Sequence, residues 1–557
     1  MHGKKRYLLS SVVTIDPKNR DAFVKKFEKE NQGKQVLLID RQALNEQYLG
    51  FLVNDFNSLV SYSFIAVFVI LFVFYRRIEL VLTAAIPIAL TGFITAGLMG
   101  LLNIPFNIFS TIVCTLVFGH GIDFTIFMTS ALQKQYTDGK DEMPLYRTSI
   151  ILAVLTTILA IGALIFAQHP ALKSIALIAL IGVSVAVLVT FVLYPLLFKF
   201  LFFNRVKKGL SPTTFFLTVR SILMFTYYVI ASLTISVFMR MFFWVLPLSK
   251  NKKWHFFSSV MSGYMQSVLY LNPAVSKKIF HKERLQQQSV IISNHTSFLD
   301  SLTIGMTYSK VVYIVNDWVY KSPVFGRAVK FLGFYPATKG VAQGLVPLEE
   351  RIGTDFSVMI FPEGTRSRTS EIGRFHKGAF FMAEELKLSI QPVYIHGNAD
   401  LLPKGDFIIY NANCHVYVGE PIALNDERFG TSYTDRTKKI SQFFKQEYNK
   451  IRLKAEDADY FKQKLFLNFL YKEHGILKAV KRDFGRNKSI YHQLFHLIGD
   501  KASIAHVTTD FGQLDFLLVN QFPSRKVHTY NCNQENRSIA KASYINQKFR
   551  VKYANDL

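Results

Sequence analysis

Residues 290 to 300 read VIISNHTSFLD. The β-branched run at residues 290–292 predicts a buried strand, and His295 follows close to the end of that strand. Asp300 stands five residues later, about one helical turn further on. A neutral imidazole can accept the proton of an attacking group, and a carboxylate bonded to the other ring nitrogen fixes its tautomer. We therefore expect His295 to act as a general base and Asp300 to orient it.

A second strand-to-turn motif follows about sixty residues downstream, where residues 359–366 read MIFPEGTR. Gly364 allows backbone N–H groups to approach an anion, and Thr365 and Arg366 add donors that suit a phosphate. A histidine base beside such a turn is suited to transfer of an acyl group from a thioester to an alcohol, with no enzyme nucleophile. Two alternatives stay open: Ser297 allows a Ser/His hydrolase, and His295 and Asp300 could simply cap a helix.

The composition indicates a membrane part. Half of the 557 residues are hydrophobic, 51 of them phenylalanine, and the formal net charge is +26. A positive balance suits nucleic acid or the anionic face of a membrane, and the apolar segments favour the membrane. We expect no nucleic-acid partner. The three cysteines lie far apart, without metal-ligand spacing, so neither a disulfide framework nor a metal site is expected.

Five apolar segments are long enough to cross a bilayer, which needs about 20 residues. They comprise residues 57–75, 80–102, 104–132, 148–168 and 174–198, and together they define a membrane domain at residues 57–205. Positive residues gather in the connections after the first, third and fifth segments, which the positive-inside rule places in the cytoplasm. The tail at residues 1–56 is then external, and strand-like runs at residues 7–13 and 35–39 predict a small α/β remnant of a larger external domain.

A further apolar segment at residues 210–250 contains Arg220 and Arg240. Because the domain that follows is basic, we expect a membrane hairpin or a pair of interfacial helices that leaves this domain on the cytoplasmic side. From residue 251 to residue 455, five β-rich runs alternate with helical or loop stretches; they comprise residues 290–293, 310–315, 356–361, 390–395 and 415–418. This alternation predicts an α/β domain, with His295 and Glu363 at the carboxyl ends of strands in its central sheet.

The last part of the chain, residues 456–557, has strand-like runs at 503–507 and 526–530. This layout resembles the methyltransferase-like tail fused to some bacterial acyltransferases, and it predicts a partial Rossmann-like α/β domain. Asn531 and Asn533 stand where a ribose-binding carboxylate would be expected. We therefore expect a truncated or degenerate domain without methyl transfer activity.

One membrane segment carries an ionisable group, since residues 119–124 read GHGIDF. A carboxylate within a span indicates a proton or ion pathway, and the alternative is a neutral Asp123 that is hydrogen-bonded within the bundle. The motif and the five spans resemble the C-terminal membrane half of RND-superfamily exporters, in particular the lipid-exporting branch. The resemblance covers about residues 1–205 and implies a proton relay at Asp123. It also implies a second chain that supplies the missing half of the transporter.

Over residues 250–455, the two motifs Asn-His-x4-Asp and Phe-Pro-Glu-Gly-Thr-Arg-Ser resemble those of the lysophosphatidic acid (glycerophospholipid) acyltransferase family. The resemblance implies a base at His295, an orienting carboxylate at Asp300 and acceptor binding by Glu363, Gly364, Thr365 and Arg366. Lys339 stands where the family usually has an arginine that holds the acceptor phosphate. No bound cofactor or metal is implied, and the co-substrate is an acyl-CoA or acyl carrier protein thioester.

Together, these features predict a multi-domain membrane protein: an α-helical transmembrane bundle, an α/β acyltransferase domain and a partial Rossmann-like tail. The expected function is a membrane-bound O-acyltransferase that transfers a fatty acyl group to a lysophospholipid-type or other lipid alcohol. The alternative is a proton-coupled RND-type lipid exporter whose acyltransferase domain makes or modifies the cargo. We expect multi-pass insertion in a bacterial inner membrane, a cytoplasmic acyltransferase domain, and membrane lipids and the acyl donor carrier as partners.

Overall fold

The structure is a computed structural model that describes residues 10–31, 36–104, 108–245, 248–322, 326–337, 348–369 and 371–554. The chain divides into two compact units. The first comprises Met1–Phe74, Ile88–Ile122 and Val154–Ala186, and the second comprises Tyr75–Pro87, Asp123–Ala153 and Val187–Leu557.

Long apolar helices dominate the first 250 residues, because a backbone in hydrocarbon must satisfy its own hydrogen bonds. They are α2 (Arg41–Tyr75), α3 (Ile78–Leu101), α4 (Ile108–Asp138), α5 (Met143–Gly162), α6 (Pro170–Leu188) and α9 (Phe215–Val245), and the short α7 (Tyr194–Phe198) and α8 (Asn204–Lys207) lie between α6 and α9. Five described helical stretches are long and apolar enough to cross a membrane: Ile78–Leu101, Thr115–Asp138, Met143–Phe166, Pro170–Lys207 and Phe215–Val245. The chain is a membrane protein. Four of these stretches match predicted spans, and the apolar part of α2, Ser61–Tyr75, is shorter.

The first unit holds a small core between its helices. Met99, Val113, Val117, Ile178 and Ala179 are buried together, so α3, α4 and α6 pack against one another. A Cβ atom on Gly182 would lie 2.6 Å from a methyl carbon of Val117. A glycine is therefore needed where α4 and α6 approach most closely, as is common between membrane helices.

The prediction of strands near the N-terminus was wrong for the residues that the structure describes. Residues 10–13 and 36–39 are not in strands, whereas α1 (Arg20–Glu30) and α2 are helical. Residues 7–9 and 35 lie outside the described ranges. A strand is stable only when a neighbour satisfies its backbone groups, and the described part of this tail provides no such neighbour.

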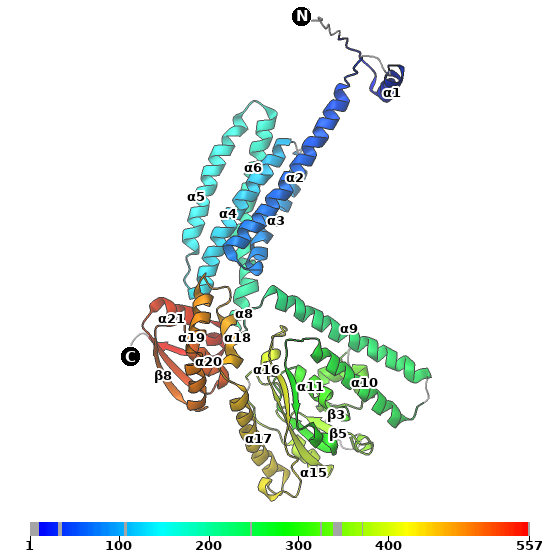
Figure 1. The fold of residues 1–557 in the computed structure, drawn as a ribbon, viewed down its shortest axis with the longest axis vertical. Coiled ribbons are helices and arrows are strands. Elements are labelled where there is room, and N and C mark those ends of the chain that lie inside the picture. The colour runs from blue at the N-terminus through cyan, green and yellow to red at the C-terminus, as the bar shows by residue number, and fades with distance from the viewer. Residues whose placement is uncertain are drawn as a thin grey trace, which may run out of the picture. The chain divides into compact units, whose positions relative to one another are not determined.

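The segment expected to form two helices is one continuous helix, α9. Its partner is the following helix, α10 (Lys250–Tyr270), which belongs to the α/β domain; Figure 1 shows the two side by side. The Tyr264 hydroxyl of α10 donates to the Tyr228 carbonyl of α9, and the two tyrosine rings stack. Neither arginine breaks the helix, since arginine is a good helix former.

The α/β domain is built on a seven-stranded sheet with strand order β1-β7-β6-β2-β5-β3-β4. Its strands are β1 (Lys277–Phe280), β2 (Ser289–Ser293), β3 (Val311–Val315), β4 (Tyr335–Pro336), β5 (Ser357–Ile360), β6 (Ser389–His396) and β7 (Cys414–Val418). Every pairing is parallel except that of β6 with β7. The five predicted strands are confirmed, and the short β1 and β4 were not predicted.

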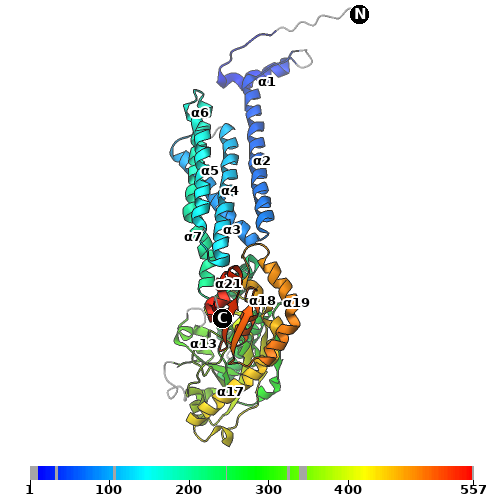
Figure 2. The same cartoon turned by 90° about the vertical axis from the view of Figure 1, so that its left-hand side faces the viewer.

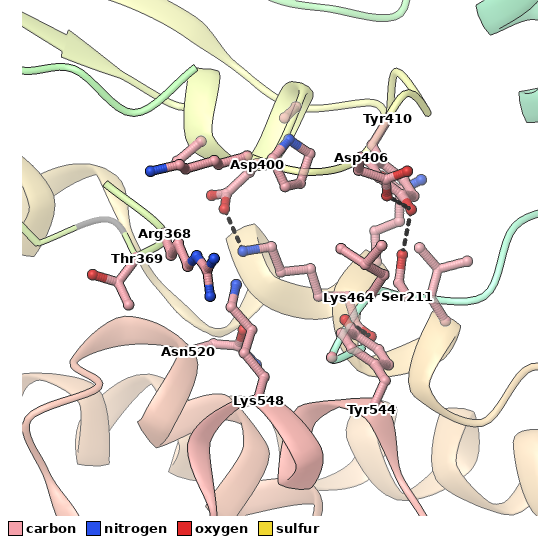
Figure 3. Close-up of a pocket in the computed structure, with 18 of the residues that line it drawn as sticks. Ser211, Arg368, Thr369, Asp400, Asp406, Tyr410, Lys464, Asn520, Tyr544 and Lys548 are labelled. Atoms are coloured by element: carbon pink, nitrogen blue, oxygen red, sulfur yellow. Dashed lines mark hydrogen bonds and ion pairs between the residues drawn. The ribbon is translucent and has the colours of Figure 1, made fainter. Parts of the chain in front are cut away.

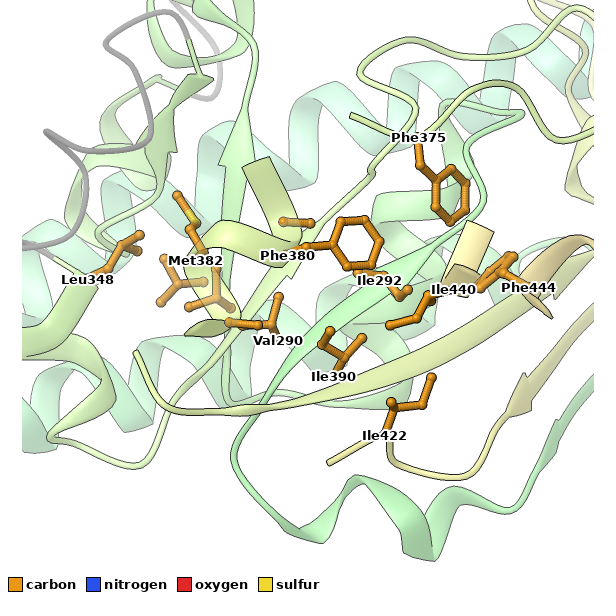
Figure 4. Close-up of a cluster of buried hydrophobic side chains, with 14 of the residues drawn as sticks. Val290, Ile292, Leu348, Phe375, Phe380, Met382, Ile390, Ile422, Ile440 and Phe444 are labelled. Atoms are coloured by element: carbon orange, nitrogen blue, oxygen red, sulfur yellow. The ribbon is translucent and has the colours of Figure 1, made fainter. Parts of the chain in front are cut away.

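Both faces of the sheet are covered, which explains the continuous apolar character of β2. Successive side chains of a strand point to opposite faces. Val290 and Ile292 pack with α15 (Gly378–Glu385) and α17 (Tyr433–Ala455), as the cluster in Figure 4 shows. Ile291 packs on the other face with Ile304 of α11 (Leu299–Thr307). The site-bearing strand thus lies in the middle of a two-sided core.

The C-terminal domain is a small α/β unit, as predicted. Helices α18 (Ala458–Asn468) and α19 (Ile476–Leu497) lie side by side in Figures 1 and 2 and precede the sheet. The sheet is parallel with strand order β10-β9-β8, formed by β8 (Ser503–Thr508), β9 (Lys526–Asn531) and β10 (Lys552–Ala554). Helix α20 (Gln513–Gln521) lies between β8 and β9, and α21 (Gln534–Lys541) and α22 (Tyr544–Phe549) lie between β9 and β10. The third strand, β10, was not predicted.

Candidate active site

The two sequence motifs lie side by side because their strands are neighbours in the sheet. Strands β2 and β5 pair in parallel, with Ile292 opposite Ile360. The segments that follow β2 and β5 therefore leave the sheet at the same edge, the carboxyl ends of the strands, where parallel α/β sheets hold their active groups. The His295 ring stacks on the Phe361 ring at a centroid distance of 4.0 Å. The Ser367 N–H donates to the His295 carbonyl at 2.7 Å, which ties the two turns together.

Asp300 holds the histidine from within the fold. Nδ1 of His295 lies 3.0 Å from Oδ2 of Asp300, and the Asp300 side chain is fully buried. The same oxygen accepts the backbone N–H groups of Thr296 and Ser297, at 2.7 and 2.8 Å. The other oxygen, Oδ1, accepts the side-chain amide of Asn398 at 3.0 Å. A carboxylate with four donors is fixed in place, and the Nδ1 contact leaves Nε2 of His295 for the substrate.

The serine hydrolase alternative does not fit this geometry. Ser297 is fully buried, and its hydroxyl donates to the Leu402 carbonyl at 2.8 Å. It also accepts the Leu299 N–H at 3.2 Å. Ser297 therefore shapes the turn before α11 and offers no nucleophile to His295. The helix-capping alternative is partly right, because Asp300 accepts two backbone N–H groups of this turn. Asp300 also contacts Nδ1 of His295, which a helix cap does not require.

Glu363 holds the backbone of the site in place and does not line the cavity in front of His295. Its Oε1 accepts the His295 N–H and its Oε2 accepts the Gly373 N–H, both at 2.8 Å. Burial raises the pKa of Glu363, against the lowering effect of these two N–H donors. The sequence resemblance implied that Glu363 binds the acceptor, whereas the structure gives it a positioning contact with the histidine backbone. Gly364 is needed at its position because its φ is +67° and a Cβ there would lie 3.3 Å from His376.

A cavity of about 580 Å³ opens in front of His295. Gly364, Thr365 and Arg366 line it, so three of the four expected acceptor-binding residues reach it. Most of the remaining wall is apolar and includes Phe298, Met261, Met265, Trp318, Val329, Leu332, Phe334 and, from α9, Tyr228. An apolar cavity with a few convergent polar groups is the usual form of a small-molecule site, and this one is suited to an acyl chain.

Several residues of the site were missed by sequence reasoning. Lys404 Nζ donates to the Arg366 carbonyl at 2.6 Å and to the Thr365 hydroxyl at 3.4 Å, which adds a second cation beside Arg366. Asn398 holds Asp300, and Asn294 binds both the N–H and the carbonyl of Ile395 at 2.9 Å, joining the end of β2 to β6. Asn294 stands directly before His295 in the sequence motif, so the motif could have indicated its role. No local pattern marks Lys404 or Asn398.

Two further predicted residues are Lys339 and Asp123. Lys339 falls outside the described residues. Asp123 lies in α4, far along the chain from the cavity, and its side chain is exposed on the described surface of that helix.

Comparisons with known proteins match two separate parts of the chain. Residues 277–396 match the Acyltransferase family, and residues 48–222 match the MMPL family. A chloroplast 1-acyl-sn-glycerol-3-phosphate acyltransferase of Arabidopsis thaliana is 30% identical over 139 residues, which is 24% of this chain and 39% of that protein. A 1-acyl-sn-glycerol-3-phosphate acyltransferase of Pseudomonas aeruginosa is 22% identical over 221 residues, covering 38% of this chain and 84% of that protein.

A solved structure of the 1-acyl-sn-glycerophosphate acyltransferase PlsC from Thermotoga maritima aligns with a TM-score of 0.38 and 16% identity, covering 42% of this chain and 96% of that chain. This chain spans about 40% of the length of two plant relatives that it matches, the 1-acyl-sn-glycerol-3-phosphate acyltransferases of Arabidopsis thaliana and Brassica napus. The matched segments contain both the helical region and the strands that carry His295, Asp300 and the Glu363 turn. The protein thus joins an MMPL-type membrane region at residues 48–222 to an acyltransferase domain at residues 277–396.

Proposed function

We propose that this protein is a membrane-bound O-acyltransferase that transfers a fatty acyl group from a thioester to the hydroxyl of a lysophosphatidate-type lipid. The observation that carries the proposal is the buried Asp300 that holds His295, with the histidine on the wall of an apolar cavity. The two relatives that cover this domain are named 1-acyl-sn-glycerol-3-phosphate acyltransferases, which supports the same substrate class.

In the proposed reaction, the acceptor hydroxyl attacks the thioester carbonyl carbon while Nε2 of His295 takes the hydroxyl proton. The resulting tetrahedral intermediate collapses, the C–S bond breaks, and the imidazolium returns the proton to the thiolate. Asp300 stabilises the imidazolium through Nδ1. Arg366 and Lys404 bring two cations to the cavity wall, where they suit the acceptor phosphate, and the apolar wall suits the acyl chain.

The setting is part of the proposal. We infer a bacterial inner membrane with the acyltransferase domain on the cytoplasmic side, where thioester donors are made and where anionic lipids attract a chain with net charge +26. The donor is an acyl-CoA or an acyl carrier protein thioester. Membrane lipids are the other partners, and no nucleic acid is involved.

A second function, proton-coupled lipid export, is favoured by the match to the MMPL family and by Asp123. Asp123 lies within an apolar stretch of spanning length, yet its side chain is exposed in the described chain. A carboxylate that faces lipid is costly, so a partner chain that covers α4 and completes the transporter would remove this cost. In this reading, the acyltransferase domain makes or modifies the cargo.

The test of the acyltransferase proposal is the His295→Ala variant, purified in lipid nanodiscs and supplied with palmitoyl-CoA and 1-acyl-glycerol 3-phosphate. Loss of a general base predicts a fall in kcat of about 10²- to 10⁴-fold. His281→Ala is the matched control, because His281 is an exposed histidine of the same domain that does not line the cavity. A His295→Ala variant that keeps the wild-type rate would refute the assignment.

A further inference from the structure

A second and larger cavity, of about 1110 Å³, lies beside the catalytic one. Three parts of the chain build its wall: the connection between α8 and α9, the acyltransferase loops around residues 366–369 and 399–413, and the C-terminal domain. The C-terminal domain contributes four residues that Figure 3 labels: Lys464 of α18, Asn520 of α20, and Tyr544 and Lys548 of α22. The acyl transfer reaction proposed above involves no residue of the C-terminal domain.

The two cavities share a wall. Arg366 and Lys404 line both of them, and Lys404 Nζ donates to the Arg366 carbonyl at 2.6 Å. His295 lines the catalytic cavity on the other side of this pair. A substrate with a long flexible arm could therefore place its reacting group at His295 and its polar end in the larger cavity.

Three of the four carboxylates that line the larger cavity are already paired with a lysine or an arginine. Asp400 forms an ion pair with Lys464 and accepts the Tyr460 hydroxyl at 2.6 Å. Asp406 pairs with Arg205 at 2.7 Å, and Asp459 pairs with Lys488 at 2.5 Å. Asp457 faces His492 at 3.7 Å.

The cations are in excess. Arg366, Arg368, Lys208, Lys404 and Lys548 all line the cavity, and within the described chain none of them has a carboxylate at ion-pair distance. In Figure 3 the side chains of Arg368, Lys464 and Lys548 point toward a common region. Desolvation by the cavity wall and the nearby charge of Lys464 lower the pKa of Lys548 to about 8, and the nearby Asp400 carboxylate opposes this shift. Cations gathered in this way attract a ligand that carries several negative charges.

We propose that this cavity binds the phosphate-bearing carrier end of the acyl donor, a nucleoside phosphate linked to a pantetheine thioester as in coenzyme A. The inference rests on the proposed acyl transfer function, because it places the thioester at His295. A glycerol phosphate has one phosphate and occupies a small fraction of this volume. The carrier end of coenzyme A has three phosphates and an extended arm, which match the separate cations, the volume and the shared wall.

The C-terminal domain then acts as a donor-binding part of the acyltransferase. Its helices α18 and α22 supply Lys464 and Lys548, and the acyltransferase loops supply Arg368, while Arg366 stays with the acceptor phosphate. This role does not require a methyl donor site, and it explains why a domain with a short three-stranded sheet is retained beside the catalytic domain.

The test measures coenzyme A and 3′,5′-ADP binding to the full chain in nanodiscs by calorimetry, together with the KM values for donor and acceptor. Lys548→Glu and Arg368→Ala should each weaken coenzyme A binding by about tenfold or more and raise the donor KM, with acceptor KM unchanged. Lys552→Ala is the matched control, because it is an exposed lysine of the same domain outside the cavity. His295→Ala should bind coenzyme A as the wild type does.

Unchanged coenzyme A binding in both cavity variants would overturn the inference, and so would a raised acceptor KM with unchanged donor KM, which would assign the cavity to the acceptor headgroup. Failure of the proposed function looks different. In that case the wild type binds coenzyme A through Lys548 and Arg368, and His295→Ala has no effect on turnover.

Discussion

Oδ2 of Asp300 lies 3.0 Å from Nδ1 of His295, and the same oxygen also accepts the backbone N–H groups of Thr296 and Ser297. One buried oxygen therefore sets both the shape of the turn and the orientation of the base. The turn cannot change shape without moving the imidazole. This coupling explains why the spacing between histidine and aspartate in the motif matters: the carboxylate must reach the ring and the two preceding N–H groups at once.

Asp300→Asn is expected to lower kcat by about 10³-fold or more while leaving both KM values close to those of the wild type. The asparagine keeps the shape of the side chain but does not stabilise an imidazolium, and its amide can hold the wrong tautomer. Steady-state kinetics check this expectation, with a thermal unfolding measurement to show that the variant is folded. A variant that loses substrate affinity and keeps kcat would contradict the orienting role.

Glu363→Gln tests whether Glu363 positions the His295 backbone or binds the acceptor. The amide nitrogen of glutamine must face one of the two N–H groups that Glu363 accepts, from His295 or Gly373. We expect a loss of about 1–3 kcal/mol in the free energy of unfolding and a fall in kcat, with acceptor KM nearly unchanged. Glu371→Gln, in the same loop, is the control. A raised acceptor KM with a normal kcat would restore the role that the sequence resemblance implied.

Arg366→Ala is expected to raise the acceptor KM by about tenfold or more, since a charge-assisted contact with a phosphate is lost. Arg374→Ala is the matched control, because Arg374 is an exposed arginine of the same loop region that lines neither cavity. The measurement is the initial rate against acceptor concentration at saturating donor. An acceptor KM equal to that of the wild type would remove Arg366 from the acceptor site.

The donor KM is expected to depend on pH through Lys548. Its pKa is lowered to about 8, so the ammonium is present below this pH and is lost as the pH rises through it. Since only the charged form attracts phosphate strongly, the donor KM should rise above pH 8. Lys548→Met should have a high donor KM at all pH values and lose this step. A wild-type profile that is flat between pH 7 and pH 9 would contradict the prediction.

Lys472→Met tests how the C-terminal domain is attached to the end of α4. The buried Lys472 Nζ donates to the Thr137 carbonyl at 2.7 Å and to the carbonyls of Ala542 and Ile539 at 3.2 and 3.3 Å. Methionine fills the space but leaves these acceptors unsatisfied, at a cost of about 1–3 kcal/mol. Limited proteolysis should then cleave the C-terminal domain faster than in the exposed Lys478→Met control. Equal cleavage rates would show that these hydrogen bonds do not hold the domain.

Local patterns were enough to predict the five main strands of the α/β domain, His295 with Asp300, and four of the five spanning stretches. Each of these depends on residues that are close in sequence: a β-branched run, a turn, or an apolar stretch of sufficient length. The same approach failed for residues 10–13 and 36–39, where alternation predicted strands. A strand depends on a partner for its backbone hydrogen bonds, and alternation alone says nothing of a partner.

By itself, the sequence indicated His295 and Asp300 as the groups proposed to carry the chemistry, and it marked the segments that are long and apolar enough to cross a membrane, because a motif and an apolar run are local. Tertiary structure decided the rest. The strand order β6-β2-β5 brings Glu363, Asn398 and Lys404 to the site of His295 from segments that lie 68 to 109 residues further along the chain. The larger cavity exists only where three parts of the chain meet. The physical reason is that contacts between distant segments depend on which faces bury one another, and no local pattern encodes that choice.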